Sequence, residues 1–372
     1  MTRASGASGG AATRGDLLRA FRVLGTDVLP ARVLAVGADV DLWLVDGVLA
    51  GLAAGGPLRA VGDGRYAVRP APPLEPSPRE ARAVRVARRI GEDFLTALNT
   101  FPDLADAPLL GFDHEPARLV LPAVGFADRA AAAAWLSDHR DLLAAAVRAG
   151  SRAGCHDLAV ALAARIWSLP APPGDRAWAH EVARWGAESA AEARRPDAVA
   201  GLLAAAARWF ADAGDFATAE LHGIRESRTR SEMGVPFGIA DALWRRAGIY
   251  RRWGRPDAAL DCYRELAAGY HDSDDRQGAA RASTAIGATL LESRRPEAAA
   301  EQLEQALRLY RGLPGTTPAE RAAVLEYLGR ALWASGEHGV ALRRLDEAMG
   351  LLADVDDRAA DRIRRLRADL ER

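Results

Sequence analysis

The sequence predicts an all-α protein: an α-solenoid of helix hairpins, preceded by a small domain of three helices and one β-hairpin. Three observations predict this fold class. A short pattern of turn residues followed by alanine recurs in the second half of the 372-residue chain. Apolar residues at helical spacing fill most of the remainder. One glycine-containing turn between two short apolar segments is typical of a β-hairpin.

The recurring pattern begins at Gly214, Gly254, Arg294 and Gly336, and an alanine follows each of these residues five positions later. The intervals between the starts are 40, 40 and 42 residues. A fixed period in this range is typical of stacked helical units. The first residue of each pattern is expected to end one helix in a left-handed conformation. The proline that follows Gly254 and Arg294 two residues later is compatible with the first turn of the next helix.

Alignment on this turn places small residues where the two helices of a hairpin should cross closely. They are Ala207, Ala247, Gly287 and Gly329 seven residues before the turn, and Ala219, Ala259, Ala299 and Ala341 after it. Large side chains occupy the positions between. This order of small and large residues resembles the tetratricopeptide repeat (TPR). The resemblance implies a right-handed solenoid, and the longer period implies longer helices or loops than in the usual repeat of about 34 residues.

The segments before these repeats differ in composition. Residues 1–15 are mostly small or polar and are interpreted as a disordered tail. Residues 16–69 carry three helical stripes and then two short strands around Gly62-Asp63-Gly64, which is the order of elements in a winged-helix domain. Residues 70–78 form a proline-rich linker.

The remaining boundaries follow from helical periodicity. Residues 79–194 are interpreted as a helical connector with degenerate repeats, interrupted by an irregular segment at 101–127. Residues 195–355 hold the TPR-like repeats. Residues 356–372 are expected to form a polar capping helix, because the last repeat of a solenoid has no neighbour to cover it.

One segment of the connector adds a second resemblance. Residues 126–136, which include Trp135 and Leu136, are followed by the apolar run 142–147. This segment resembles one that lies between winged helix and TPR repeats in actinobacterial AfsR/SARP and NB-ARC (STAND) type regulators. The resemblance implies the sensor half of such a regulator. The ATPase domain is absent from the sequence, since no glycine-rich phosphate-binding loop with a lysine occurs.

Composition excludes several classes of function. All 49 basic residues are arginine, so no lysine is present for phosphate binding or Schiff-base chemistry. The seven histidines lack the spacing of metal ligands, and no serine lies in a nucleophile elbow. The sequence therefore predicts a non-enzyme without cofactor or metal. Two isolated cysteines, the lack of a signal peptide and the lack of a membrane span predict a cytoplasmic location.

The TPR resemblance implies a concave groove lined by the first helix of each repeat. By position, the candidate partner-binding residues are Arg208, Asp241, Trp244, Arg251, Arg252, Arg281, Thr284, Glu326, Arg330 and Trp333, with Asp212 and Glu292 beside them. Arginine contacts carboxylates through two hydrogen bonds, and tryptophan offers a flat anchor. This composition favours acidic or C-terminal carboxylate ligands. The alternative interpretation is that these arginines are solvated or paired with neighbouring acids.

These observations predict a non-catalytic protein- or peptide-binding module, a regulator or adaptor in a high-GC bacterium. No membrane partner is expected, and no oligomeric state is assigned. DNA is disfavoured as a partner, because the net charge is −1 and residues 40–53, the third helix of the N-terminal domain, contain no arginine but hold Asp41 and Asp46. Two alternatives stay open: a winged-helix transcriptional regulator that binds DNA, and an accessory protein that binds a peptide substrate for a biosynthetic enzyme.

Overall fold

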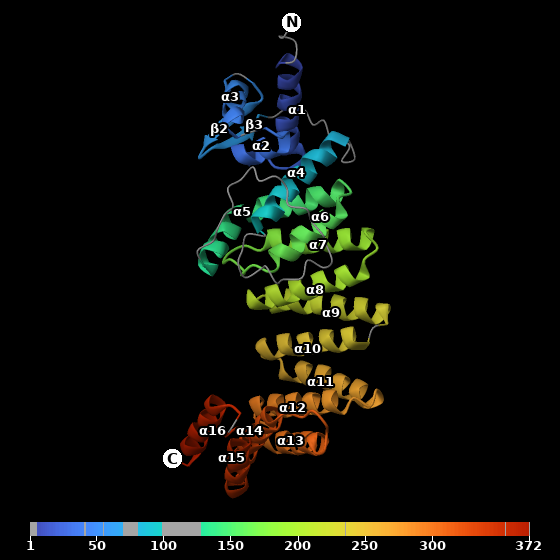
Figure 1. The fold of residues 1–372 in the computed structure, drawn as a ribbon, viewed down its shortest axis with the longest axis vertical. Coiled ribbons are helices and arrows are strands. Elements are labelled where there is room, and N and C mark those ends of the chain that lie inside the picture. Colours follow the sequence, from blue (N-terminus) through green and yellow to red (C-terminus); the bar gives the residue numbers. More distant parts are fainter. Residues whose placement is uncertain are drawn as a thin grey trace. The chain divides into compact units, whose positions relative to one another are not determined.

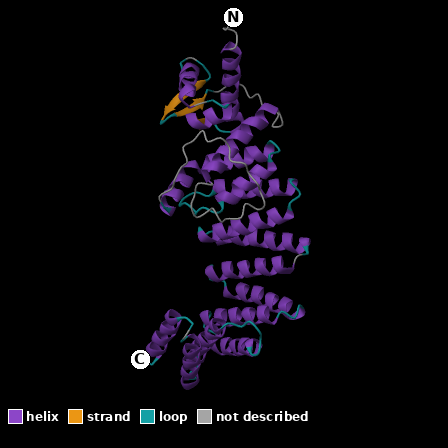
Figure 2. Cartoon of the chain, in the orientation of Figure 1, coloured by secondary structure: helices purple, strands orange, loops and turns teal. Residues whose placement is uncertain are grey.

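The computed structural model describes residues 6–40, 42–54, 56–69, 81–98, 128–234, 236–353 and 355–371. Figure 1 shows that helices make up almost all of the described chain, and the strands form one small sheet (Figure 2). The all-α prediction is confirmed. Contacts divide the chain into two compact units, Met1–Asp215 and Phe216–Arg372, which are described separately below. The predicted linker at 70–78 and the irregular segment at 101–127 lie outside the described residues.

The first unit begins with three helices and a small antiparallel sheet. The helices are α1 (Gly6–Leu24), α2 (Ala31–Ala38) and α3 (Leu42–Ala53), and the strands are β1 (Val28–Pro30), β2 (Leu58–Gly62) and β3 (Arg65–Val68). The order in the sheet is β1-β3-β2, with Val28 opposite Ala67 and Leu58 opposite Val68. The predicted hairpin of β2 and β3 is confirmed, and its turn holds Asp63 and Gly64 at positive φ.

Two details of this region differ from the sequence expectation. Strand β1 was not predicted, because three residues ending in proline carry neither alternation nor a turn signal. Helix α1 begins at Gly6, inside the segment interpreted as a disordered tail. Alanine and arginine in residues 11–14 favour helix, and a helix that has formed its first turn extends at little cost.

The rest of the first unit is a stack of helices. These are α4 (Ala81–Leu98), α5 (Arg129–Arg152), α6 (His156–Ile166), α7 (Ala177–Glu192) and α8 (Pro196–Asp212). Trp209 on α8 lies edge-on to Trp167 and Trp178, with ring centroids 5.4 and 5.6 Å apart. Its indole nitrogen donates to the Leu169 carbonyl at 3.1 Å, so the buried donor is satisfied.

The second unit contains eight helices among its described residues. They are α9 (Phe216–Met233), α10 (Pro236–Arg252), α11 (Pro256–Asp272), α12 (Arg276–Glu292), α13 (Pro296–Tyr310), α14 (Pro318–Ala334), α15 (His338–Leu352) and α16 (Asp357–Leu370). One continuous apolar core runs from α10 to α15, and a smaller one joins α14 and α15 to α16. The predicted final helix is thus present and packs on the last hairpin.

Most helices end in the same left-handed turn, and its spacing is half of the period found in the sequence. Residues at positive φ recur every 20 positions, at Gly154, Gly174, Arg194, Gly214, Gly234, Gly254, Asp274 and Arg294. At Gly254 the amide donates to the Arg251 carbonyl, and the next amide, of Arg255, reaches back to the Tyr250 carbonyl at 2.9 Å. This pair of bonds satisfies carbonyls that the helix end leaves open.

The small residues lie where helices cross, as the alignment predicted. Ala259, Ala299 and Ala341 are fully buried. A Cβ placed on Gly287 would lie 2.5 Å from the Leu303 side chain, and one on Gly329 would lie 2.8 Å from Leu345. The α12–α13 and α14–α15 hairpins therefore depend on a glycine in one helix facing a leucine in the other. None of the described helices is long and apolar enough to span a bilayer.

Candidate functional site

The candidate surface is carried by α10, α12 and α14, the first helices of the three hairpins in the second unit, and is called the first-helix face here. Its centre is Trp244 on α10. The indole nitrogen donates to the Tyr270 hydroxyl at 3.0 Å, and the indole ring lies edge-on to Tyr263 at 5.1 Å. The Arg281 guanidinium lies over the same ring, 5.8 Å from its centroid. Trp244 is half-buried, so its ring is held by three side chains from α11 and α12 and still reaches the surface.

The next hairpin repeats this arrangement with other residues. Thr284 takes the position equivalent to Trp244, and it lies close enough to Tyr310, 40 residues after Tyr270, to affect the pKa of the Tyr310 hydroxyl. Burial and the nearby Glu320 raise the pKa of the Tyr310 hydroxyl, while Arg281 and Thr284 lower it. In the first two of these hairpins, a tyrosine at the end of the second helix thus contacts a side chain of the first helix. Sequence analysis did not identify Tyr270 and Tyr310, because the first-helix residue beside each tyrosine changes from tryptophan to threonine.

Arg281 lies between the two arrangements. It faces the Trp244 ring on one side and is close enough to Glu320 and Tyr310 on the other to affect their pKa values. Hydrogen bonds to the backbone and side chain of Thr317 hold the pKa of the Glu320 carboxyl low. Among the described residues Arg281 forms no ion pair, and its side chain is exposed. Its guanidinium edge is therefore available to a ligand.

Arg251 forms an ion pair with another residue of the protein. Its guanidinium forms two hydrogen bonds with Glu292 of α12, one of them 3.1 Å from Nε to Oε2, and also bonds Tyr263. The bond to Glu292 raises the pKa of Arg251, against the effect of burial. Arg251 therefore fits the alternative interpretation of the sequence, in which an arginine of this face is paired with a neighbouring acid. Binding of a ligand carboxylate by Arg251 would require displacement of Glu292.

The other predicted residues of the second unit are spread along the first-helix face. Asp241 is exposed. Arg252 lies 5.9 Å from the ring centroid of Phe216, and Arg330 lies 5.8 Å from that of Tyr327. Trp333 is half-buried and stacks on His338 at 4.2 Å. These contacts keep two cations and a second indole at the surface, but no described contact joins them to Trp244.

Glu326 does not lie on an open surface, in contrast to the sequence expectation. It is buried, and Arg362 of α16 donates to both carboxylate oxygens at 2.6 and 2.8 Å. The position is equivalent to Trp244 and Thr284, but the residue opposite it in the final hairpin is Leu352 instead of tyrosine. A carboxylate without a hydroxyl partner takes its hydrogen bonds from the capping helix.

Arg208 belongs to α8 in the first unit, where its side chain is exposed. The predicted site residues therefore fall in two units. Those of the second unit lie on α10, α12 and α14, with Glu326 buried among them, whereas Arg208 is described only within the first unit.

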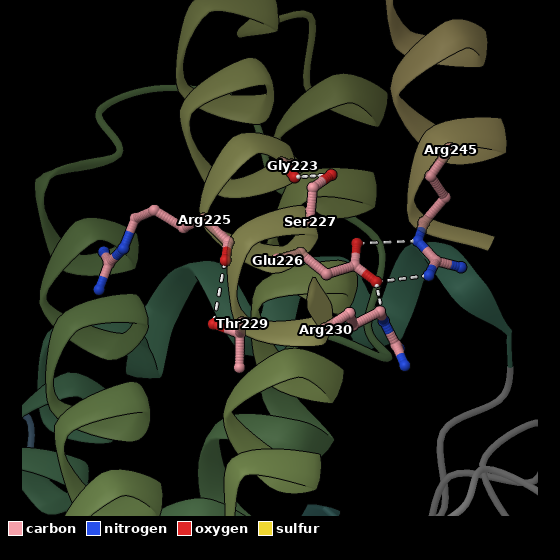
Figure 3. Close-up of polar contacts among 7 residues, drawn as sticks. All are labelled: Gly223, Arg225, Glu226, Ser227, Thr229, Arg230 and Arg245. Atoms are coloured by element: carbon pink, nitrogen blue, oxygen red, sulfur yellow. Dashed lines mark hydrogen bonds and ion pairs between the residues drawn. The ribbon is translucent and has the colours of Figure 1, made fainter. Parts of the chain in front are cut away.

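Sequence reasoning also missed a buried charge cluster on α9 and α10. Figure 3 shows the carboxylate of Glu226 directed at Arg245 of the neighbouring helix and Arg230 of its own helix. Glu226 is fully buried, and it accepts from Arg230 Nε at 2.7 Å and from Arg245 Nη2 and Nε at 2.5 and 3.1 Å. Two arginines on one carboxylate satisfy the buried charge and tie α9 to α10. The i, i+4 spacing of Glu226 and Arg230 was a signal that could have found half of it.

In the first unit, a cleft of about 920 Å³ lies beside α2 and α5, with Arg32 and His139 in its lining. His139 Nδ1 bonds the Trp135 carbonyl at 2.8 Å and Nε2 faces the Arg32 guanidinium, an arrangement that fits a neutral imidazole. Burial lowers the pKa of His139. Burial also raises the pKa of Asp93 to about 6, although Arg32 opposes it.

Comparison with known proteins supports the repeat assignment. A family profile described as tetratricopeptide repeat matches residues 238–312, which cover most of α10 and all of α11, α12 and α13. Among solved structures, a crystal structure of BtubC (BKLC) from P. vanneervenii is similar, with 20% identity and a TM-score of 0.45. The match covers 62% of this chain and 92% of that chain, and this likeness is too small to extend to function. No curated protein matches the chain.

Proposed function

Because residues 238–312 match tetratricopeptide repeats, we propose that the second unit is a protein-interaction module whose first-helix face binds a peptide carrying a carboxylate. Tetratricopeptide repeats generally bind proteins or peptides, which supports this class of function. The single observation that carries the proposal is the pairing of Trp244 with Arg281. An indole fixed by the Tyr270 hydroxyl lies beneath a guanidinium that has no ion pair among the described residues.

The chemistry of this pair suits one terminal or side-chain carboxylate. The ring restrains Arg281 on one face, so the guanidinium edge is oriented before a ligand arrives, and less rotamer entropy is lost on binding. Arginine offers two parallel hydrogen bonds to a carboxylate. The half-buried ring beside it would contact the apolar part of the same ligand residue.

The wider role belongs to the same proposal. The resemblance of the connector to AfsR/SARP and NB-ARC type regulators supports a place in regulation, with the chain acting as an adaptor. For the N-terminal helices and sheet we propose contact with protein and not with duplex DNA. Support comes from residues 40–53, which carry two aspartates and no arginine. Salt-dependent binding of the purified chain to duplex DNA would contradict this part.

The test is binding of short peptides to the full chain, measured by fluorescence anisotropy. Peptides selected from a random library with free carboxyl termini are compared with their amidated forms. We expect Arg281→Glu and Trp244→Ala each to weaken binding by about tenfold or more, because loss of a central anchor costs about 2 kcal/mol. Amidation should weaken binding by a similar factor.

The matched control is Arg264→Glu on α11 of the same repeat. Arg264 is exposed and pairs with Asp261 at 2.9 Å, so this variant makes the same charge change away from the first-helix face. It should bind like the unmodified chain. Equal losses in Arg264→Glu and Arg281→Glu would show that only overall charge matters, and unchanged binding in both Arg281→Glu and Trp244→Ala would reject the site.

A further inference from the structure

A second charged site lies in the second unit, on α13, α14 and α15. These helices enclose a cavity of about 300 Å³. Its lining residues are Glu304, Leu307, Arg308, Arg311, Arg321, Arg344 and Glu347. None of them belongs to the predicted site or to the cluster around Trp244, so this cavity is a separate feature, called the arginine cavity below.

Helical spacing explains why these side chains meet. Glu304 lies three residues before Leu307 and four before Arg308, which places all three on one face near the end of α13, and Arg311 directly follows the helix. Arg344 and Glu347 are three apart on α15 in the same way. Leu307 packs against both apolar cores of the unit, so the cavity has an apolar base and a charged rim.

The charges in the arginine cavity do not balance. Arg344 pairs with Glu347 at 3.2 Å, and Arg308 pairs with Glu304 at 3.9 Å, the outer limit of an ion pair. Among the described residues Arg311 and Arg321 have no carboxylate partner. Four guanidinium groups against two carboxylates leave two positive charges in excess, which a dianion would neutralise.

One residue that lines this cavity also has an unsatisfied hydrogen-bond donor. Arg344 Nε is buried and has no hydrogen-bond partner in the described structure, although another nitrogen of the same guanidinium pairs with Glu347. A buried donor without a partner is unfavourable, and an oxyanion would supply the missing acceptor. Charge and hydrogen bonding therefore point to the same kind of ligand.

We propose that the arginine cavity binds a phosphate monoester dianion. The planar guanidinium group matches phosphate oxygens with two hydrogen bonds, and the charge of a phosphate monoester near neutral pH is close to the excess of two. A volume of about 300 Å³ is at the lower end for ligand sites, which favours a single phosphorylated group over a nucleotide. This assignment is independent of the peptide-binding role of the first-helix face.

The first experiment titrates inorganic phosphate into the full chain by isothermal titration calorimetry, with chloride used to hold ionic strength constant. Saturable binding is expected. Arg311→Gln and Arg321→Gln should each weaken it by about tenfold, since each removes charged hydrogen bonds to the anion. Glu304→Gln should strengthen it, because Arg308 is then released from its carboxylate. All three positions are exposed, and circular dichroism would verify that the variants fold.

The matched control is Arg264→Gln, an exposed arginine on α11 that should leave phosphate binding unchanged. A second arm compares inorganic phosphate with a phosphoserine peptide and its unphosphorylated form. Tighter binding of the phosphopeptide would identify a phosphorylated side chain as the source, and equal binding would indicate a free phosphate. Absence of saturable phosphate binding, or equal affinity in the unmodified chain and Arg311→Gln and Arg321→Gln, would overturn the proposal.

Discussion

Each unit contains a carboxylate removed from water, half-buried Asp93 in the first and fully buried Glu226 in the second, and the two are stabilised in different ways. In the first unit, Asp93 on α4 has Arg32 nearby as a charge, but the described residues give its carboxylate no hydrogen bond from that arginine, which instead faces His139. In the second unit, Glu226 on α9 is fully buried and accepts hydrogen bonds from both Arg230 and Arg245. Burial raises the pKa of Asp93 to about 6.

The difference shows that a nearby positive charge does not replace direct hydrogen bonds. A carboxylate that is buried loses its hydration free energy, and attraction to a cation at a distance offsets only part of this loss. Direct hydrogen bonds from two guanidinium groups to the carboxylate oxygens offset more of this loss. We therefore expect Glu226 to hold α9 and α10 together through its two arginine partners, and Asp93 to destabilise the first unit whenever it is ionised.

The largest effect is expected for Glu226→Ala. Removal of the carboxylate leaves Arg230 and Arg245 without their shared partner while their side chains are only 22% and 32% exposed. Loss of one member of a buried ion pair costs about 3 kcal/mol or more. Urea denaturation of the full chain should show a lower free energy of unfolding for the second unit.

The control for this variant is Glu232→Ala on the same helix. Glu232 pairs with Arg228 at 2.9 Å, but its side chain is 63% exposed. Exposed pairs of this kind contribute less than about 1 kcal/mol. If Glu232→Ala and Glu226→Ala cost the same, burial is not what makes the second cluster important.

The pH dependence of the free energy of unfolding of Asp93→Asn tests the difference between Asp93 and Glu226. The folded pKa, about 6, lies above the unfolded value of about 4, so the folded state binds the proton more tightly. Ionised Asp93 therefore lowers the free energy of unfolding as pH rises from 4 to 6, and the loss persists at pH 7. Asp93→Asn should equal the unmodified chain near pH 4 and exceed it by about 2 kcal/mol at pH 7.

The measurement is urea unfolding of both chains across this pH range, followed by a signal of the first unit. Asp63→Asn serves as the control, because Asp63 lies in the hairpin turn with its side chain 90% exposed. A change below about 0.5 kcal/mol is expected there. A stability difference between Asp93→Asn and the unmodified chain that stays constant from pH 4 to 7 would contradict the raised pKa of Asp93.

How far the sequence predicts this molecule depends on the kind of contact. The hairpins were predictable because their contacts are periodic: Gly287 facing Leu303 reappears as Gly329 facing Leu345. Only every second turn was recognised, however. The alternate turns at Gly234 and Asp274 have the same left-handed backbone. Gly234 is followed five residues later by Ile239 instead of alanine, and Asp274, although followed by Ala279, has neither a glycine at the turn nor a proline two residues later.

The candidate site was less predictable because it depends on partners outside the repeat pattern. Position in the first helix selected Trp244 and Arg281, which the structure brings together. The equivalent position in the last hairpin also selected Glu326, but this residue is paired with Arg362 of α16, a helix outside the repeats. The arginine cavity was not predicted, since its residues come from three helices and share no motif.

Glu326 offers the smallest of the expected effects and an intermediate case between Asp93 and Glu226. Its side chain is 9% exposed, and its only described partner, Arg362, is 62% exposed. In Glu326→Gln an oxygen still accepts a hydrogen bond and Arg362 remains in water, so we expect a loss of about 1 kcal/mol. The loss should be local, because this pair joins α14 to the final helix. Hydrogen exchange should therefore show faster exchange of amides in α16 while those in α10–α13 are unchanged.

The control is Asp346→Asn, which weakens a second described ion pair between α16 and the last hairpin. Asp346 accepts from Arg367 at 2.7 Å, and its side chain is 49% exposed. If burial of the carboxylate decides the strength of these contacts, this variant should cost less than about 0.5 kcal/mol and leave α16 protected. Equal loosening of α16 in both variants would mean that the number of ion pairs, and not their burial, holds the capping helix. The ranking of Glu226 above Glu326 would then rest on its second arginine alone.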